Sequence, residues 1–360
     1  MNSFYKRCAR GLGVLALAAT VSACAVGTDS GTYRQRNLVS DTPSIPAANT
    51  DANLVNAWGV AFNPFGVVWV ANNGTGTSTL YDGNGVPQTL VVTIPPATPG
   101  ATGNPTGIVF YGGQAFRVTG GGVTAPARFI FASEDGSITA WAPQVNPTNA
   151  LRVAGNSAAI YKGLAISAGG TGPLLYATDF YNARVDVFDG DFAPVTLPGT
   201  PFRDPHLPAG YAPFGIQALN GDIYVTYARQ NAAREDVVTG PGFGFVSVFD
   251  PNGVFVRRLI SRGPLNAPWG IALAPASFGQ FGARLLVGNF GDGRINAFEL
   301  ASGKWLGALR GPDHRPISID GLWGLQFGNG LSNQPTNTLF FASGPDDERH
   351  GLYGRIDVND

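Results

Sequence analysis

The segment APWGIALAP, residues 267–275, shows the pattern that decides the fold, because a glycine followed by an aliphatic residue recurs along the chain. The same pattern occurs in NAWGVAF (56–62), NPTGIVF (104–110), YKGLAIS (161–167), APFGIQAL (212–219) and GLWGLQFG (321–328). The glycines are Gly59, Gly107, Gly163, Gly215, Gly270 and Gly324, which lie 48, 56, 52, 55 and 54 residues apart. Six units of about 50 residues indicate a repeat architecture.

Each unit continues with further strand-like runs. In the fifth unit, LLVGNF is followed by the alternating run RINAFE and then by KWLGALR. The 50 glycines and 27 prolines of the 360-residue chain, with few apolar residues at helical spacing, also favour short strands joined by turns. The sequence therefore predicts an all-β fold, a six-bladed β-propeller with four antiparallel strands per blade.

The two ends of the repeat region are complementary. The sixth unit closes with GLYGRIDVND (351–360) and lacks a fourth run, while RNLVSD (36–41) precedes the first unit without a partner. An open edge between the first and last blades would expose unpaired backbone groups. We therefore expect residues 36–40 to form the outer strand of the last blade.

Three stretches carry a family resemblance. YATDFYNARVDVFDGDF (176–192) and LVGNFGDGRINAFE (286–299) resemble NHL-type propeller repeats, and residues 37–82 are similar to the start of a family of uncharacterised exported bacterial propellers. The resemblance covers nearly the whole chain after the N-terminal segment. It implies the fold but no activity, because propellers host binding proteins and many kinds of enzyme.

The N-terminal residues predict export. Lys6, Arg7 and Arg10 precede the apolar run 11–23, and VSAC (21–24) resembles the bacterial lipoprotein box. We expect a signal peptide at 1–23, a lipidated Cys24 with a flexible tether at 24–35, and the propeller at 36–360. The protein would then be exported and anchored by lipid in the bacterial cell envelope. The alternative is an ordinary secretory signal with a chance cysteine.

Composition excludes some partners and chemistries. Only 13% of the residues are charged and the net charge is -1, so we expect no nucleic-acid partner and membrane contact only through the lipid anchor. Motifs of the types GxxxxGK[ST], GxSxG and HExxH are absent from the sequence. The three histidines, His206, His314 and His350, lie in separate proline- or glycine-flanked loops and do not predict a metal cluster.

The residue before each repeat glycine forms one column across the blades. Since the innermost strands line the central channel, this column predicts a ring at one mouth of the channel. The members of the ring are Trp58, Thr106, Lys162, Phe214, Trp269 and Trp323. The aromatic members either pack between blades as core or form a stacking surface for a sugar, an aromatic or a cationic group.

A second column follows the second strand of each unit and lies on the same face. Its members are Asn72, Ser133, Asp179, Tyr227, Asn289 and Ser343. Oxygen ligands from several blades, with Glu134, Asp179 and Asn289 as candidates, could hold a calcium ion, as in lactonase-type propellers. The other interpretation is that these residues accept turn N–H bonds at strand ends.

The fourth unit carries a charged insertion, RQNAAREDVVTGPG (229–242), that we expect on the same face as either a lid or a mobile loop.

Two main functional hypotheses follow. The first is a noncatalytic module that binds a protein, glycan or small molecule at the aromatic-lined mouth; the alternative is a calcium-assisted hydrolase or lactonase-like enzyme at the same place. A purely structural role, with the channel filled by its own side chains, is the third. The absence of a dense acid–base constellation favours the first.

Overall fold

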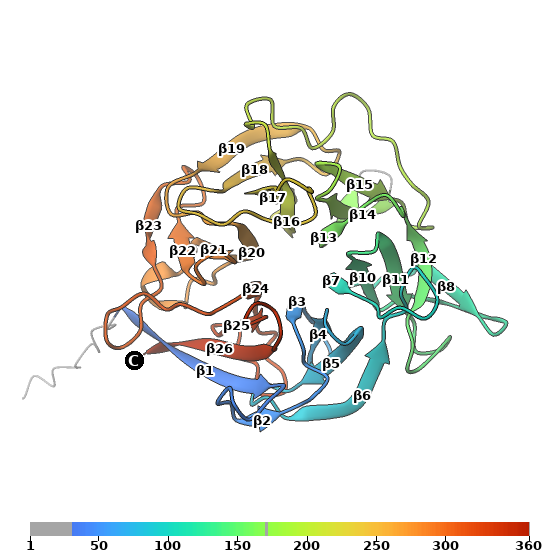
Figure 1. Ribbon diagram of the computed structural model, residues 1–360, viewed down its shortest axis with the longest axis horizontal. Helices are drawn as coiled ribbons and strands as arrows, with labels where there is room; N and C mark the ends of the chain where they lie inside the picture. The colour runs from blue at the N-terminus through green and yellow to red at the C-terminus, as the bar shows by residue number, and fades with distance from the viewer. Residues whose placement is uncertain (1–30, 170–171, 360) are drawn as a thin grey trace, which may run out of the picture.

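The structure is a computed structural model that describes residues 31–169 and 172–359, and in this part six β-sheets surround a central axis like the blades of a propeller (Figure 1). Residues 1–30, which contain the expected signal and Cys24, lie outside the described residues. The predicted all-β propeller is confirmed. Apart from the single-turn 3-10 helix η1 (Gly279–Phe281), the described elements are strands.

Four blades have four antiparallel strands, as expected. Blade 1 is β3 (Ala57–Phe62), β4 (Val68–Asn72), β5 (Thr77–Tyr81) and β6 (Pro87–Thr93). Blade 2 is β7 (Pro105–Phe110), β10 (Phe129–Ser133), β11 (Ser137–Trp141) and β12 (Leu151–Gly155), with a hairpin of β8 (Arg117–Gly120) and β9 (Val123–Pro126) inserted after β7. Blade 4 is β16 (Tyr211–Leu219), β17 (Asp222–Arg229), β18 (Phe245–Phe249) and β19 (Phe255–Ser261). Blade 5 is β20 (Pro268–Leu273), β21 (Leu285–Asn289), β22 (Ile295–Phe298) and β23 (Trp305–Ala308).

Blade 6 joins the two ends of the propeller. It consists of β24 (Leu322–Phe327), β25 (Leu339–Ser343), β26 (Leu352–Asn359) and β1 (Thr32–Ser40), with the short β2 (Asn49–Thr50) beside β1. β1 pairs antiparallel with β26 from Thr32 opposite Asn359 to Ser40 opposite Leu352. The predicted closing strand is therefore confirmed, and it begins four residues earlier than expected, within the segment we had assigned to the tether.

Blade 3 departs from the prediction, since it has only three strands: β13 (Tyr161–Gly169), β14 (Gly172–Asp179) and β15 (Arg184–Phe188). The segment after β15, residues 189–210, contains five prolines. A proline has no N–H to give to a neighbouring strand, so a run with this spacing cannot form a regular fourth strand. The chain instead loops around the outside of the blade (Figure 1).

The six repeat glycines let the inner strands approach one another around the axis. A Cβ atom placed on Gly59 would lie 2.5 Å from the carbonyl oxygen of Thr106, and one on Gly215 would lie 2.0 Å from that of Trp269. Gly324 closes the circle, because its Cβ would lie 2.5 Å from the carbonyl oxygen of Trp58. Each repeat glycine thus meets the backbone of the next inner strand, and only a residue without a side chain fits there.

Large side chains fill the space between blades farther from the axis. The rings of Trp69 and Phe129 stack 4.0 Å apart between blades 1 and 2, and Trp141 packs against Trp69 at 4.7 Å. Tyr33 of β1 donates from its hydroxyl to the carbonyl of Phe278 and accepts from the N–H of Phe281. The closing strand is therefore tied to blade 5 as well as to β26.

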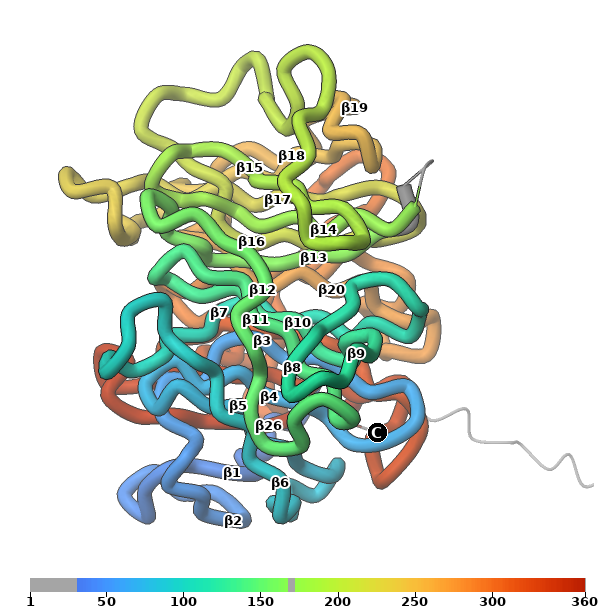
Figure 2. Tube along the Cα trace, turned by 90° about the vertical axis from the view of Figure 1, so that its right-hand side faces the viewer, coloured from blue at the N-terminus to red at the C-terminus, as the bar shows by residue number. Residues whose placement is uncertain are grey.

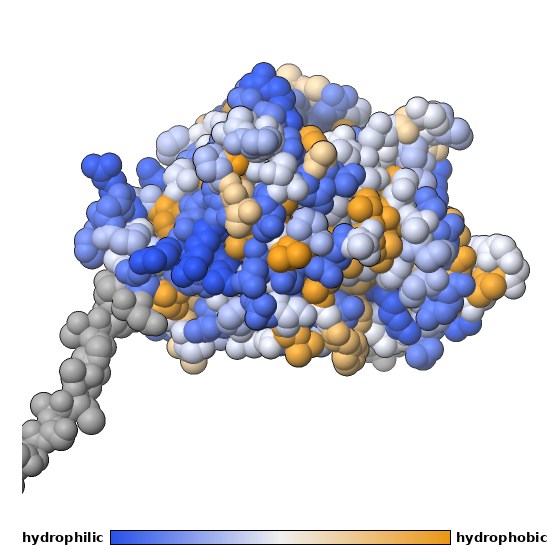
Figure 3. All heavy atoms as spheres, turned by 90° about the horizontal axis from the view of Figure 1, so that it is seen from below, coloured by the Kyte–Doolittle hydropathy of each residue, from blue (hydrophilic) through white to orange (hydrophobic). Residues whose placement is uncertain are grey.

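The side of the molecule that carries β1, β2 and β6 has hydrophobic residues scattered among hydrophilic ones, without a single apolar band (Figure 3). In the part of the chain that the structure describes, no helix has the length and apolar character needed to cross a bilayer.

We predict that Gly215→Ala destabilises the fold by about 3 kcal/mol, because the new methyl group would overlap the backbone of the next inner strand. Gly66→Ala is the matched control, since a Cβ atom there meets only the Asn63 amide at 3.4 Å, and we expect a change within about 0.5 kcal/mol. Urea unfolding of both variants measures the difference. Equal stabilities would contradict the close-approach explanation.

Candidate ligand site at the channel mouth

The predicted aromatic ring assembles at one mouth of the channel, and its side chains are buried. Each of its six members is at most 9% exposed. Trp58 and Trp323 stack with ring centroids 3.5 Å apart, and Trp269 meets both edge-on, at 6.1 and 5.7 Å. Phe214 packs against Trp323 at 5.6 Å. The faces of these rings contact one another, as the core-packing interpretation expects. A small hollow among the inner strands is lined by glycines, aliphatic side chains, Gln217 and Trp269.

A polar network surrounds the edge of this aromatic cluster. The indole N–H of Trp58 donates to Asn56 Oδ1 (2.9 Å), and the Asn56 amide donates to Asn73 Oδ1 (3.2 Å). The Asn73 amide donates to Glu134 Oε2 (2.8 Å), whose other oxygen accepts from Lys162 Nζ (2.5 Å). Lys162 Nζ in turn lies 5.2 Å from the Trp58 ring centroid, a cation–π distance. Side chains from blades 1, 2 and 3 thus form a closed circuit.

Glu348 brings a second acid to this network from blade 6. It lies in the turn between β25 and β26, where Asp346, Asp347 and Glu348 all have positive φ angles, and its N–H donates to the carbonyl of Gly344. Its Oε1 atom is buried and has no hydrogen-bond partner among the described residues. Trp323 Nε1, in the aromatic cluster, is also buried without a partner in that part of the chain. A buried polar atom without a partner is a place where a water or another polar group can bind.

The electrostatics of the cluster are unusual for a surface turn. Burial, together with the charges of Glu134 and Asp236, raises the pKa of Glu348 from its ordinary value of 4.5 to about 7, although Lys162 and Asn56 act in the opposite direction. Burial also lowers the pKa of Lys162, but Glu134, Asp236 and Glu348 more than offset this, so that the pKa of Lys162 stays above its ordinary value. Lys162 is therefore charged at neutral pH, while Glu348 is near its midpoint.

The blade-4 insertion reaches the same mouth. Val237 packs against the aromatic cluster that contains Trp58, Trp269 and Trp323. Asp236 is exposed beside it, and its charge acts on both Lys162 and Glu348. The insertion is the yellow loop that projects from one face of the molecule in Figure 2. Its predicted position on the face of the ring is therefore supported.

The second column of residues serves the hairpins of individual blades. The Asn72 amide donates to Thr77 and Thr79, and Asp179 accepts from the N–H groups of Ile160 and Asn182. The Asn289 amide donates to the carbonyl of Pro264 and to Asp292. Only Asp179 accepts turn N–H groups as that interpretation of the column expects, because Asn72 and Asn289 act as donors. The Oδ1 atoms of Asn72 and Asn289 and the Oγ atoms of Ser133 and Ser343 are buried without a hydrogen-bond partner among the described residues.

The calcium candidates are not gathered into one site. Asp179 Oδ2 lies 3.3 Å from Arg184 Nε, whereas Glu134 is held by Lys162 and Asn73 in a different network. Among residues 31–169 and 172–359, no group of three His, Cys, Asp or Glu residues is placed to hold a metal ion. Asn289 has other partners again, the carbonyl of Pro264 and the Asp292 carboxylate.

Sequence reasoning identified Trp58, Lys162 and Glu134 but missed Glu348, Asn56 and Asn73. Asn73 follows Asn72 as Glu134 follows Ser133, and Asn56 lies two residues before Trp58, so the two columns lead to both asparagines. Glu348 lies in the long turn between β25 and β26, to which no column alignment points.

We predict that Glu348 makes the stability of the fold depend on pH. Because the folded chain holds the Glu348 proton more tightly than the unfolded chain, this contribution is full below about pH 4.5 and is lost as the pH rises through 7. Glu348→Gln should therefore match the wild type in melting temperature near pH 4.5 and exceed it at pH 8. A constant difference across thermal melts from pH 4.5 to 8 would contradict the raised pKa.

Solved structures of other proteins share the fold at low sequence identity. A glucose dehydrogenase superposes with a TM-score of 0.54 at 13% identity, over 91% of this chain and all of its own. A streptogramin B lyase gives 0.50 at 13% identity over 91% and 97% of the two chains, and a Bacteroides thetaiotaomicron protein of unknown function gives 0.51 at 13% over 85% and 70%. These likenesses show the fold alone.

Curated relatives cover most of the chain. Uncharacterized protein R648 of Acanthamoeba polyphaga mimivirus is 36% identical over 337 residues, which span 90% of this chain and 80% of the relative. Uncharacterized protein L690 of the same virus is 32% identical over 338 residues, or 90% and 86% of the two chains. No family model matches, and membership of an exported bacterial family stays a prediction. The chain, a six-bladed β-propeller, therefore belongs to one family with the uncharacterized mimivirus proteins R648 and L690.

Proposed function

We propose that this propeller is a noncatalytic binding module that takes a small, positively charged ligand at the channel mouth. The observation that carries the proposal is Glu348 Oε1, a buried carboxylate oxygen without a partner among the described residues. An ammonium group on a ligand would supply the missing donor.

The charges around Glu348 favour a cation over an anion. When Glu348 is ionised, three carboxylates, those of Glu134, Asp236 and Glu348, act on a mouth whose neighbouring cation is Lys162. The Lys162 ammonium already lies over the Trp58 ring and binds Glu134. A ligand cation would meet the remaining negative charge, and its binding would be strongest above pH 7, where Glu348 carries that charge.

The hydrogen bonds that Glu134 and Lys162 already make support a role in binding over a role in catalysis. Both oxygens of Glu134 accept hydrogen bonds, one from Lys162 and one from Asn73. Lys162 is 3% exposed and paired, so its ammonium is held in the charged form. Glu134 and Lys162 are thus held by each other, and the mouth resembles a recognition site more than a proton-transfer site.

Thermal melts with organic cations at pH 8 test this proposal. Putrescine, spermidine and choline are the probes, and 1,4-butanediol is the neutral counterpart of putrescine. A cation at a hundred times its dissociation constant should stabilise the fold by about 2.7 kcal/mol. We expect Glu348→Gln to weaken this binding at least tenfold, because the substitution removes the charge that the cation meets.

The matched control is Glu235→Gln, which removes a carboxylate from the exposed insertion on the same face. It should bind the cations nearly as well as the wild type does. Stabilisation by butanediol equal to that by putrescine, or equal cation binding by Glu348→Gln, would refute a cation site at Glu348.

We further propose that the protein is exported and anchored by lipid at Cys24, a proposal that rests on the basic N-terminal residues and the VSAC motif. Cys24→Ser should lose metabolic labelling by a fatty-acid analogue in a bacterial host and move from the membrane fraction to the soluble fraction. An unlabelled wild-type protein would show the anchor assignment to be wrong.

A further inference from the structure

The outer edge of blade 3 is open, in contrast to the edges of its neighbours. β15 is the outermost strand of its blade (Figure 1), whereas blades 2 and 4 add β12 and β19 at the same place. The proline-containing segment after β15 pairs with it only at its end, through a single bridge between Phe188 and Pro194. Most of the length of β15 therefore lacks a neighbouring strand.

The hydrogen bonds at this end establish which backbone groups of β15 face outward. The N–H of Val195 donates to the carbonyl of Val187 (2.8 Å), and the N–H of Asp189 donates to the carbonyl of Ala193 (2.9 Å). Since the N–H and C=O of one residue in an antiparallel strand point to the same side, and alternate residues share that side, the odd-numbered residues face away from β14. The N–H and C=O of Val185 and the N–H of Val187 thus point outward, and they have no partner in the described part of the chain.

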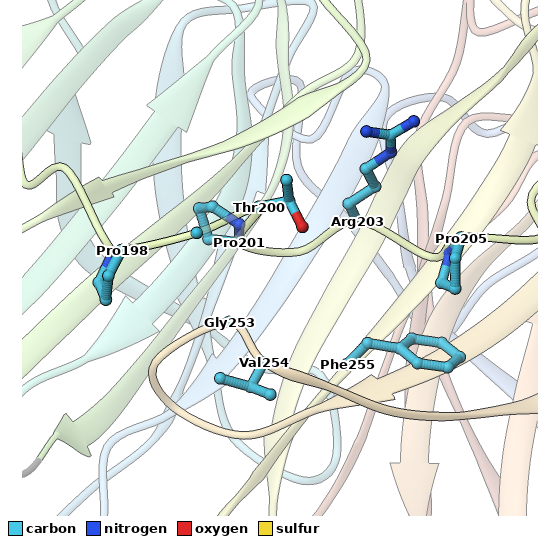
Figure 4. A pocket seen from close by; sticks show the side chains of 9 residues that line it. Pro198, Thr200, Pro201, Arg203, Pro205, Gly253, Val254 and Phe255 are labelled. Atoms are coloured by element: carbon cyan, nitrogen blue, oxygen red, sulfur yellow. The ribbon is translucent and has the colours of Figure 1, made fainter.

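A groove of about 730 Å³ runs along this edge. The turn at Gly155–Ser157 lines it with polar groups, and Val195, Leu197 and Pro201 line it with apolar ones. Gly199 and Pro201 also line a neighbouring hollow of about 430 Å³, which lies between the segment 198–205 and the turn that contains Val254 (Figure 4). The edge is therefore recessed between walls, with room beside it.

We propose that this groove binds an extended peptide segment of a partner protein, which adds to β15 as the fourth strand of blade 3. Outward donors and an outward acceptor spaced along one strand match the backbone of another extended chain, the mode of recognition known as β-augmentation. Successive side chains of the added strand would point to opposite faces. A segment of alternating polar and apolar residues would therefore meet both the Asn156–Ser157 wall and the Val195–Leu197 wall.

The recessed position favours a single slender strand over a second copy of this chain. A symmetric pair of copies would bring β15 against β15, and the segments that flank the groove, 155–157 and 194–201, would then face the same segments of the second copy. A peptide segment brings no such walls. The site is also separate from the channel mouth, so it does not depend on the proposed cation binding.

Proline substitution tests the outward N–H directly. Val185→Pro removes one docking donor without breaking a bond to β14, and an edge strand tolerates proline when its N–H side faces solvent. Val185→Ala is the matched control, because it shortens the side chain at the same position and keeps the N–H. The probe is a phage-displayed library of random nine-residue peptides, selected on the full chain and followed by affinity measurements with the selected peptides.

We expect selected peptides to alternate polar and apolar residues, to bind Val185→Ala nearly as well as the wild type, and to bind Val185→Pro about tenfold more weakly. Amide hydrogen exchange at Val185 and Val187 should be fast in the free protein and slow in the complex. Failure to select any peptide, equal binding to Val185→Pro, or unchanged exchange would each overturn the proposal. A dimer of the full chain that dissociates on Val185→Pro would assign the edge to a second copy and would also overturn it.

Discussion

The close approach of six inner strands around one axis is the constraint on which the rest of the structure depends. At each repeat glycine, a Cβ atom would lie within 2.8 Å of the backbone of the next inner strand. The blades can therefore meet at the centre only where a side chain is missing. One residue earlier, the same strands diverge enough to hold Trp58, Trp269 and Trp323, whose rings fill the mouth of the channel. The repeat glycines thus let the inner strands meet at the axis, and the tryptophans that precede three of them fill the space at the mouth.

This packing also explains the unusual environment of the charged side chains at the channel mouth. The aromatic rings of the cluster pack against one another, so polar side chains from the surrounding turns lie against an apolar surface that is at most 9% exposed. Lys162 and Glu134 satisfy each other there, whereas Glu348 is partly desolvated beside two other acids and retains its proton to unusually high pH. The raised pKa of Glu348 thus follows from its position, where the blade-6 turn and the blade-4 insertion both lie against the aromatic cluster.

The fold could be read from the sequence because its cause is periodic. The glycines recur in each blade. The sixth unit lacks a fourth strand and one strand-like segment precedes the first unit, so both the blades and the closing strand were predictable. The site was only half predictable. Trp58 and Lys162 belong to a repeated column, but Glu348 reaches the mouth through a turn of three consecutive positive-φ residues, which no other turn has within residues 31–169 and 172–359. Blade 3 was misjudged for a similar reason, since the strand count was extended to a segment whose prolines remove the N–H donors that a fourth strand needs.

The central claim is that the half-buried Glu348 has a carboxylate oxygen, Oε1, that is unpaired among the described residues and available to a cation. A carbon-13 NMR titration of the glutamate carboxyl carbons tests it most directly, with the Glu348 signal assigned by its loss in Glu348→Gln. We predict a midpoint near pH 7 for the free protein, as its environment requires, and a fall in that midpoint when putrescine is added, because a bound cation favours the charged form. A midpoint near 4.5, the ordinary value for glutamate, or one that putrescine leaves unchanged, would contradict the account.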